Sequence, residues 1–102
     1  MSLPERQARS ALARLVTQRG LLRGNLLERR RVCGKPNCRC VRGELHASLY
    51  LVFSEGGTLR QRFIPKAWEA RVRQWVRDYH EGRRLLEEIT RLYYEKVRQR
   101  QD

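Results

Sequence analysis

Residues 33–40 read CGKPNCRC, and this stretch, with the histidine that follows it, decides how we expect the chain to fold. It places Cys33, Cys38, Cys40 and His46 in the spacing Cys-x4-Cys-x-Cys-x5-His. A structural zinc is held by four nitrogen or sulfur ligands in a closed tetrahedron, and three cysteines with one histidine are a usual set. The Gly, Pro and Asn between the first two cysteines favour a turn. The sequence therefore predicts a structural Zn2+ in a zinc-knuckle-like loop.

Other chemistry is open to the same residues. The three cysteines can be reduced thiols, or one disulfide with a thiol left over, although an odd count argues against the disulfide framework of a secreted protein. Basic neighbours of the Cys38-x-Cys40 pair favour thiolate, which allows redox chemistry. The fourth ligand also stays open, because His80, a residue of a second chain or water can replace His46.

The size and charge of the chain point to a partner. A chain of 102 residues is one domain by length and buries only a modest core, so a structural metal adds directly to the folding free energy. Lys and Arg number 23 against 11 Asp and Glu, which gives a net charge of +12. Such a field attracts polyanions, of which nucleic acid is the commonest in a cell. The charge predicts binding to nucleic acid, in the first place DNA.

The residues before the cysteine stretch predict a helix and then a strand. Residues 1–20 repeat apolar side chains at helical spacing, with Ser2 as candidate N-cap and Gly20 as stop signal. From residue 24 the pattern favours a strand that leads into the cysteine loop. A helix through residues 28–31 is the competing interpretation.

The residues after the cysteine stretch predict a hairpin. Residues 47–53 are rich in β-forming side chains, Glu-Gly-Gly-Thr at 55–58 is typical of a tight turn, and residues 59–64 alternate in strand fashion. Together with the first strand they predict a three-stranded antiparallel sheet over residues 24–64. The cysteine loop joins its first two strands.

Four arginines of this sheet are expected to share one face. Alternation puts Arg60 and Arg62 on the side opposite to Leu59, Gln61 and Phe63. We expect Arg29 and Arg31 to join these two arginines across the strands. This face and the adjoining loop would contact phosphates. The predicted nucleic-acid-binding residues are Arg29, Arg30, Arg31, Lys35, Arg39, Arg42, Arg60 and Arg62.

Residues 65–100 are expected to be helical. Apolar residues recur at helical spacing from Trp68 to Val97, with Gly82 between them, which predicts one long helix bent near the glycine or two helices with a short link. This region packs on the N-terminal helix or pairs with a second copy as a short coiled coil. The fold class is therefore α+β, in a single small domain over residues 1–102.

Several classes of protein are not expected. No run of eighteen apolar residues is present, and the charged N-terminus lacks the apolar core of a signal peptide. Free cysteines fit a reducing compartment, so we expect a cytoplasmic protein without membrane contact. The sequence has no Gly-rich phosphate loop, no usefully spaced carboxylate pair and no Ser/His/Asp grouping. Glu44, the acid nearest the cysteines, stands in no H-x-E or HExxH context, so no enzyme is expected.

The motifs described so far resemble a known family. RGNLLER at 23–29, CGKPNCRC at 33–40, the histidine, the tyrosine-containing strand, the Gly-Gly hairpin and the long charged helix resemble small bacterial and archaeal proteins without assigned function. Genes of that family often lie near transposase and other mobile-element genes. The resemblance covers about residues 22–97, and it departs at Ala47-Ser48, where the family commonly has Gly-Pro. It implies that the cysteine cluster is a family feature and that a role in mobile-element DNA transactions is open. It implies no activity.

Three functions follow as hypotheses. The first is a small, basic, non-enzymatic nucleic-acid-binding protein with a structural zinc, an accessory of mobile-element DNA transactions. The second is a protein-interaction adaptor or dimerising scaffold that acts through its C-terminal helix, as a homodimer or on a larger mobile-element protein. The third is redox sensing by the cysteine pair.

Overall fold

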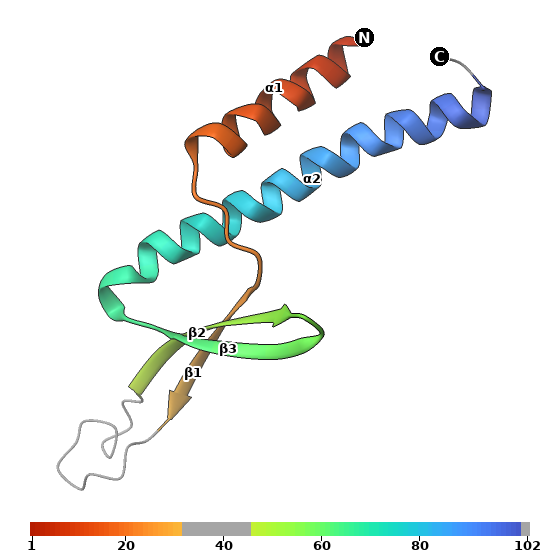
Figure 1. Cartoon of the computed structure of the whole chain (residues 1–102). Helices are drawn as coiled ribbons and strands as arrows, with labels where there is room; N and C mark the ends of the chain where they lie inside the picture. The colour runs from red at the N-terminus through yellow and green to blue at the C-terminus, as the bar shows by residue number, and fades with distance from the viewer. Residues whose placement is uncertain (32–45, 101–102) are drawn as a thin grey trace, which may run out of the picture. The chain divides into compact units, whose positions relative to one another are not determined.

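The structure, a computed structural model, describes residues 1–31 and 46–100 and runs from a helix through three strands to a long helix (Figure 1). The elements are α1 (Leu3–Gln18), β1 (Asn25–Arg31), β2 (His46–Glu55), β3 (Thr58–Ile64), the short 3-10 helix η2 (Lys66–Trp68) and α2 (Glu69–Gln99). The predicted α+β fold class, with its N-terminal helix, three-stranded antiparallel sheet and long C-terminal helix, is confirmed.

The chain divides into two compact units. The helical unit comprises Met1–Arg23 and Gln74–Asp102, and the sheet unit comprises Gly24–Arg73. Helix α2 therefore begins in the sheet unit and continues in the helical unit. We expected a single domain from the length of the chain, and the division into two units does not test that prediction.

Helix α1 begins after the predicted N-cap Ser2 and ends at Gln18, two residues before the predicted stop signal Gly20. The Ser2 side-chain oxygen accepts a hydrogen bond from the Glu5 backbone N–H at 3.3 Å, which satisfies one of the free donors of the first turn. The chain leaves the helix after Gln18, and at Gly20 it passes close to α2. A Cβ atom at Gly20 would lie 2.5 Å from Nε1 of Trp75, so only glycine fits there without a shift.

Helix α2 is one continuous helix of 31 residues. Of the two predicted arrangements, a single helix is therefore correct. Glu69 stands in the first turn and Lys96 and Arg98 stand in the last, and both placements complement the helix dipole. In the two described stretches of the chain, no helix has both the length and the apolar character that crossing a bilayer requires.

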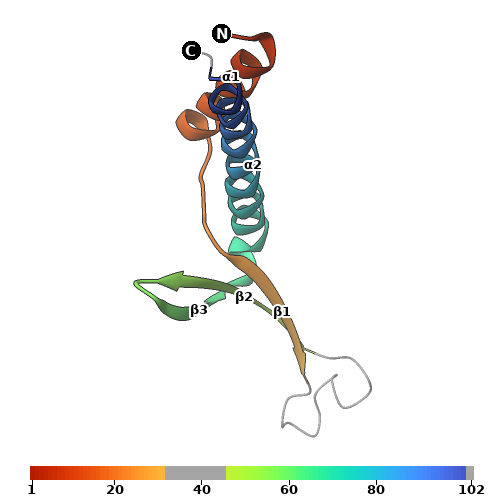
Figure 2. The same ribbon diagram turned by 90° about the vertical axis from the view of Figure 1, so that its right-hand side faces the viewer.

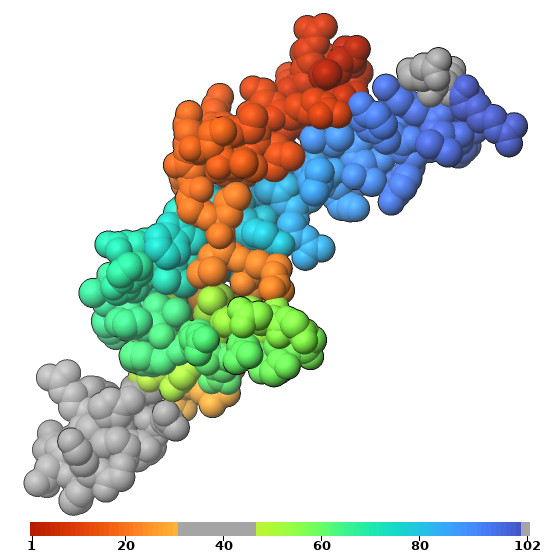
Figure 3. All heavy atoms as spheres, in the orientation of Figure 1, coloured from red at the N-terminus to blue at the C-terminus, as the bar shows by residue number. Residues whose placement is uncertain are grey.

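The two helices of the helical unit run antiparallel. Residues near the start of α1 bond to residues near the end of α2, and Figures 1 and 2 show the two ribbons side by side. Ala8, Leu85 and Ile89 are buried between them, with Ala11, Leu12 and Leu15 packed against that cluster. In the space-filling view the red and orange spheres of α1 lie against the blue spheres of α2 (Figure 3). This apolar seam is the helical stripe that the sequence predicted.

The sheet unit is built on the order β1-β2-β3, with both pairs antiparallel. Gly56 and Gly57, at φ values of 58° and 82°, form the two-residue turn between β2 and β3. Two successive positive φ values are typical of the type I′ turn, whose twist matches that of the strands. The predicted hairpin is confirmed, and β1 is the strand that we favoured over a helix.

Gly24 fixes the entry to the sheet. Its φ is +148°, and a Cβ atom there would lie 2.8 Å from Cδ1 of Leu51 and 3.0 Å from the Val52 carbonyl oxygen. The backbone of Gly24 thus lies directly against β2. Among the described residues of this unit, Leu49, Leu51, Ile64 and Val72 are the buried apolar side chains, and Leu49, at 1% exposure, is the most completely buried of them.

Candidate nucleic-acid interface

Most of the predicted cysteine loop lies outside the described residues. Cys33, Cys38 and Cys40 fall within residues 32–45, as do the predicted phosphate contacts Lys35, Arg39 and Arg42. The backbones of Arg31 and His46 are described, and these two residues pair directly at the end of the β1–β2 ladder. Within the described residues, no three His, Cys, Asp or Glu side chains come together as a metal site.

The strand register separates the arginines that we expected on one face. Arg60 pairs with Phe53 and Arg62 with Leu51, so these two arginines share a face with the buried Leu49 and Leu51. Arg29 pairs with Ser48, which directly precedes Leu49 in β2 and therefore points to the other side of the sheet. Arg29 thus lies on the face opposite to Arg60 and Arg62. The predicted four-arginine face is wrong for this reason. By the same register, Arg30 joins Arg60 and Arg62.

We call the face that carries Arg29 the open face. Its members with described side chains are Asn25, Leu27 and Arg29 of β1, Ser48, Tyr50, Val52 and Ser54 of β2, and Leu59, Gln61 and Phe63 of β3. The register aligns Leu27, Tyr50 and Phe63 in one row across the three strands. Phe63 is 59% exposed and Leu59 is 73% exposed, so this face is accessible in the described chain.

Arg29 is fixed on the open face by two neighbours. Its guanidinium lies over the Tyr50 ring at 5.2 Å, and its Nη2 donates to Oε1 of Gln61 at 3.1 Å. The Tyr50 ring in turn meets Phe63 edge to face, with 5.8 Å between centroids. Tyr50 and Phe63 were not predicted as site residues, because only the register across β1, β2 and β3 reveals the row that they form. The sequence did contain one signal for this row, because the alternation in residues 59–64 places Phe63 on the face opposite to Arg60 and Arg62.

The arginines elsewhere in the sheet unit have mixed partners. Arg60 forms an ion pair with Glu55 at 3.2 Å, and Arg30 approaches Glu28 at 3.8 Å. The guanidinium of Arg62 lies 5.9 Å from the centre of the Phe53 ring, and that of Arg71 lies 4.2 Å from the centre of the Trp68 ring. We call Arg29, Arg62 and Arg71 the ring-stacked arginines. Within the described residues no carboxylate forms an ion pair with any of the three.

The helical unit pairs its cations with acids. Arg19 donates to the buried carboxylate of Asp78 through Nε at 2.9 Å, and Gln74 donates to the other oxygen of Asp78 at 3.0 Å. On the outer face of α2, Arg84 pairs with Glu81 at 2.6 Å. Arg84 lowers the pKa of the Glu81 carboxyl through that hydrogen bond. These pairs neutralise part of the positive charge of this unit.

One buried acid joins the two helices. Glu5 is 2% exposed; its Oε2 accepts from Arg9 Nε at 2.7 Å and from the Tyr93 hydroxyl at 3.0 Å. Arg9 also donates to the Tyr93 oxygen, and the Lys96 ammonium lies over the Tyr93 ring at 4.7 Å. The hydrogen bond from Arg9 lowers the pKa of the Glu5 carboxyl, and Tyr93 adds to this effect against the opposing effect of burial.

Acid is expected to weaken the helical unit through Glu5. Because the folded-state pKa lies below the ordinary value, the charged carboxylate stabilises the fold above that value, and the contribution disappears as pH falls through the lowered pKa. Glu5→Gln should lower the thermal midpoint at pH 7, and the gap from wild type should close towards pH 3. Circular dichroism melts of both proteins across this range measure the gap.

Glu81→Gln is the matched control for this test. It removes an acid of the same unit whose pKa is also lowered, but that acid belongs to a surface pair on one helix and contributes little to stability. A gap for Glu5→Gln that stays constant from pH 7 to pH 3 would show that its charge does not stabilise the fold.

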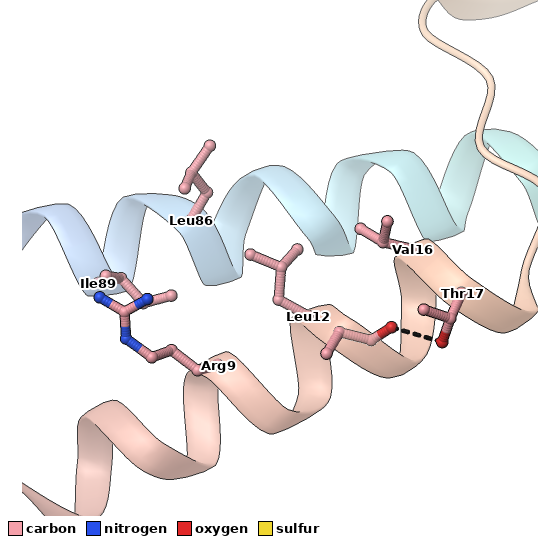
Figure 4. A pocket seen from close by; sticks show the side chains of 7 residues that line it. Arg9, Leu12, Val16, Thr17, Leu86 and Ile89 are labelled. Atoms are coloured by element: carbon pink, nitrogen blue, oxygen red, sulfur yellow. Dashed lines mark hydrogen bonds between the residues drawn. The ribbon is translucent and has the colours of Figure 1, made fainter. Parts of the chain in front are cut away.

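An apolar groove runs between α1 and α2. It has a volume of about 600 Å3 and is lined by Arg9, Leu12, Ala13, Val16, Thr17, Leu86 and Ile89. Figure 4 shows Leu12 directed from α1 towards α2, and the Thr17 hydroxyl turned back to the Ala13 carbonyl. Val16 is 60% exposed and Leu86 is 55% exposed. Apolar side chains at this level of exposure along one groove are typical of an interaction surface.

A family model for a domain of unknown function (DUF6788) matches residues 3–74. The chain belongs to this family. The match spans α1, the whole sheet unit and the first turns of α2. The DUF6788 assignment agrees with the expected membership in a family without assigned function, while the cysteine stretch as a family feature and the mobile-element neighbourhood stay predictions. Comparison with curated proteins and with solved structures found no match.

Proposed function

We propose that this DUF6788 protein binds nucleic acid, in the first place DNA, through the exposed arginines of its sheet unit. In this role it is a non-enzymatic, cytoplasmic accessory of mobile-element DNA transactions. The observation that carries the proposal is that the ring-stacked arginines contact aromatic rings and form no ion pair with a described carboxylate. Aromatic rings orient these three guanidinium groups, and no described carboxylate neutralises them. An oriented, unneutralised guanidinium is suited to bidentate contact with phosphate oxygens.

The contrast between the two units supports this choice of surface. The sheet unit carries eleven basic and four acidic residues, whereas the helical unit carries twelve and seven. In the helical unit Arg9, Arg19, Arg84 and Arg98 each bond a carboxylate at 2.9 Å or less. The sheet unit, with a net charge of +7 against +5, is therefore the more basic of the two units.

A structural zinc is part of the same proposal. The three cysteines and His46 supply a usual ligand set, and the pairing of Arg31 with His46 brings the two ends of residues 32–45 together. A segment whose ends are already paired loses less conformational entropy when its side chains converge on one ion. In this proposal the ion stiffens the end of the sheet that carries Arg29 and Arg30.

Salt dependence of DNA binding is the test. Each phosphate contact that releases a counterion adds about −0.9 to the slope of log K against log salt on duplex DNA. We expect Arg62→Gln to lower affinity and to reduce the size of that slope by about one. Fluorescence anisotropy with a labelled duplex between about 25 and 200 mM salt covers the range over which such contacts weaken.

Arg84→Gln is the control, because Arg84 is already paired with Glu81 and Glu88. It should leave both the affinity and the slope close to those of wild type. Absence of binding at low salt, or equal slopes for wild type and Arg62→Gln, would contradict the proposal.

The adaptor function remains the second candidate, and the groove between α1 and α2 is the observation that favours it. A second copy of the chain is the occupant that we propose for that function, since each copy would cover the exposed Val16 and Leu86 of the other. In that case Leu86→Glu would lower the molecular mass measured by sedimentation and leave DNA affinity unchanged.

A further inference from the structure

We propose that the open face of the sheet binds single-stranded nucleic acid by stacking a base on Phe63, next to Tyr50, with Arg29 beside them for the phosphates. This inference rests on the proposed function and names the form of nucleic acid that this one face takes. It adds a stacking surface to the electrostatic contacts described above.

The first observation is that the open face is apolar at its centre although it is exposed. In an antiparallel sheet with one buried face, the other face ordinarily carries polar side chains. Here Leu49, Leu51 and Ile64 are buried on one side, while the row on the other side consists of Leu27, Tyr50 and Phe63. Leu27 is 41% exposed and Phe63 is 59% exposed. An exposed apolar row within a polar rim marks an interaction site.

The second observation is the sign of the charge around that row. None of the ten residues of the open face is acidic, and Arg29 lies in their midst. By register, Glu28 and Glu55 fall on the opposite face. The remaining side chains are uncharged: Asn25, Ser48, Ser54 and Gln61 are polar, and Val52 and Leu59 are apolar. An apolar row beside a positive charge, without acidic side chains, complements nucleic acid, because nucleic acid combines anionic phosphates with flat bases.

The geometry of the rings selects single strands. The Arg29 guanidinium lies over Tyr50, and the Phe63 ring stands at 66° to the Tyr50 ring, so Phe63 presents a surface that Arg29 does not cover. Base faces are accessible only where bases are unstacked, as in single strands, loops and ends. Aromatic side chains on exposed sheets can stack about two or three bases, and guanidinium planes stack bases as well.

The test compares Phe63→Leu with Tyr94→Leu in the full chain under reducing conditions. Both variants exchange an exposed ring for an aliphatic side chain, but Phe63 lies on the open face and Tyr94 lies on α2 in the helical unit. We expect Phe63→Leu to weaken binding to a labelled oligothymidine by about 5- to 30-fold, as loss of one base–aromatic stack does. Tyr94→Leu should stay within about twofold of wild type, because it leaves that stack in place. Phe63→Trp should restore the affinity.

Duplex DNA separates this inference from the proposed function. Phe63→Leu should bind a long, blunt-ended duplex as wild type does, since the base faces inside a duplex are stacked on one another. Equal oligothymidine affinities for Phe63→Leu and wild type would overturn the stacking site and leave the proposed function intact. A change in sedimentation of Phe63→Leu without a change in affinity would overturn it in favour of contact between copies. If wild type binds neither probe at low salt, both proposals fail.

Discussion

Gly24→Ala is expected to destabilise the sheet unit by about 3 kcal/mol, which combines strain at an unfavourable φ with a steric clash. The φ of +148° suits glycine alone, and the new Cβ atom would lie 2.8 Å from Leu51 and 3.0 Å from the Val52 carbonyl oxygen. Leu51 belongs to the buried side of the sheet and the carbonyl is part of β2, so neither moves without disturbing the sheet. Urea unfolding followed by circular dichroism at pH 7 measures the loss.

Gly82→Ala is the matched control, because it makes the same chemical change in α2. A Cβ atom there would meet Leu12 Cδ1 at 3.7 Å, an ordinary contact, and alanine favours helix over glycine by about 1 kcal/mol. This variant should therefore be more stable than wild type. If Gly24→Ala unfolds at the wild-type urea concentration, or Gly82→Ala loses more stability than Gly24→Ala, the account of these two backbone positions is wrong.

Removal of zinc is expected to have the second large effect. Protein purified under reducing conditions without added metal should carry one zinc ion per chain in native mass spectrometry, and Cys38→Ser should lose it. Structural zinc contributes about 10–16 kcal/mol of apparent binding free energy in small peptides, which exceeds the whole stability of many domains. A chelator should therefore lower the unfolding midpoint of wild type strongly and that of Cys38→Ser hardly at all.

Two histidine variants identify the fourth ligand. His46→Ala should weaken zinc retention, whereas His80→Ala, on the exposed surface of α2, should retain it. The reverse result would move the fourth ligand to His80. A folded chain that carries no metal would mean ordinary thiols and would favour the adaptor function over the zinc-stiffened sheet.

The sequence predicted local elements well because their signals are local. Ser2 marks the start of α1, and the Gly56-Gly57 pair needs positive φ at two successive positions, which hardly any other dipeptide accepts. The helical spacing after Trp68 predicted α2. Its continuity through Gly82 was not decided, because a glycine costs a helix only about 1 kcal/mol and packing on α1 can offset that.

The sheet faces could not be predicted from the same information. Alternation within β3 separates Arg60 and Arg62 from Phe63, but it does not relate β3 to β1, which is more than twenty residues away in the sequence. A shift of one residue in the β1–β2 register moves Arg29 from one face to the other, and the fourteen residues between the strands leave that shift open. The row of Leu27, Tyr50 and Phe63 was missed for this reason.

The division into units also fixes an order of events during synthesis. The sheet unit is continuous in sequence, so the ribosome releases all of it before most of α2. Helix α1 emerges first, but its buried partners Leu85 and Ile89 come about eighty residues later, and a helix of 16 residues is marginal in water by itself. At a translation rate of about 5–20 residues per second, the apolar face of α1 stays uncovered for several seconds until Leu85 and Ile89 have been synthesised. During that interval the nascent chain is open to chaperones or to another copy of itself.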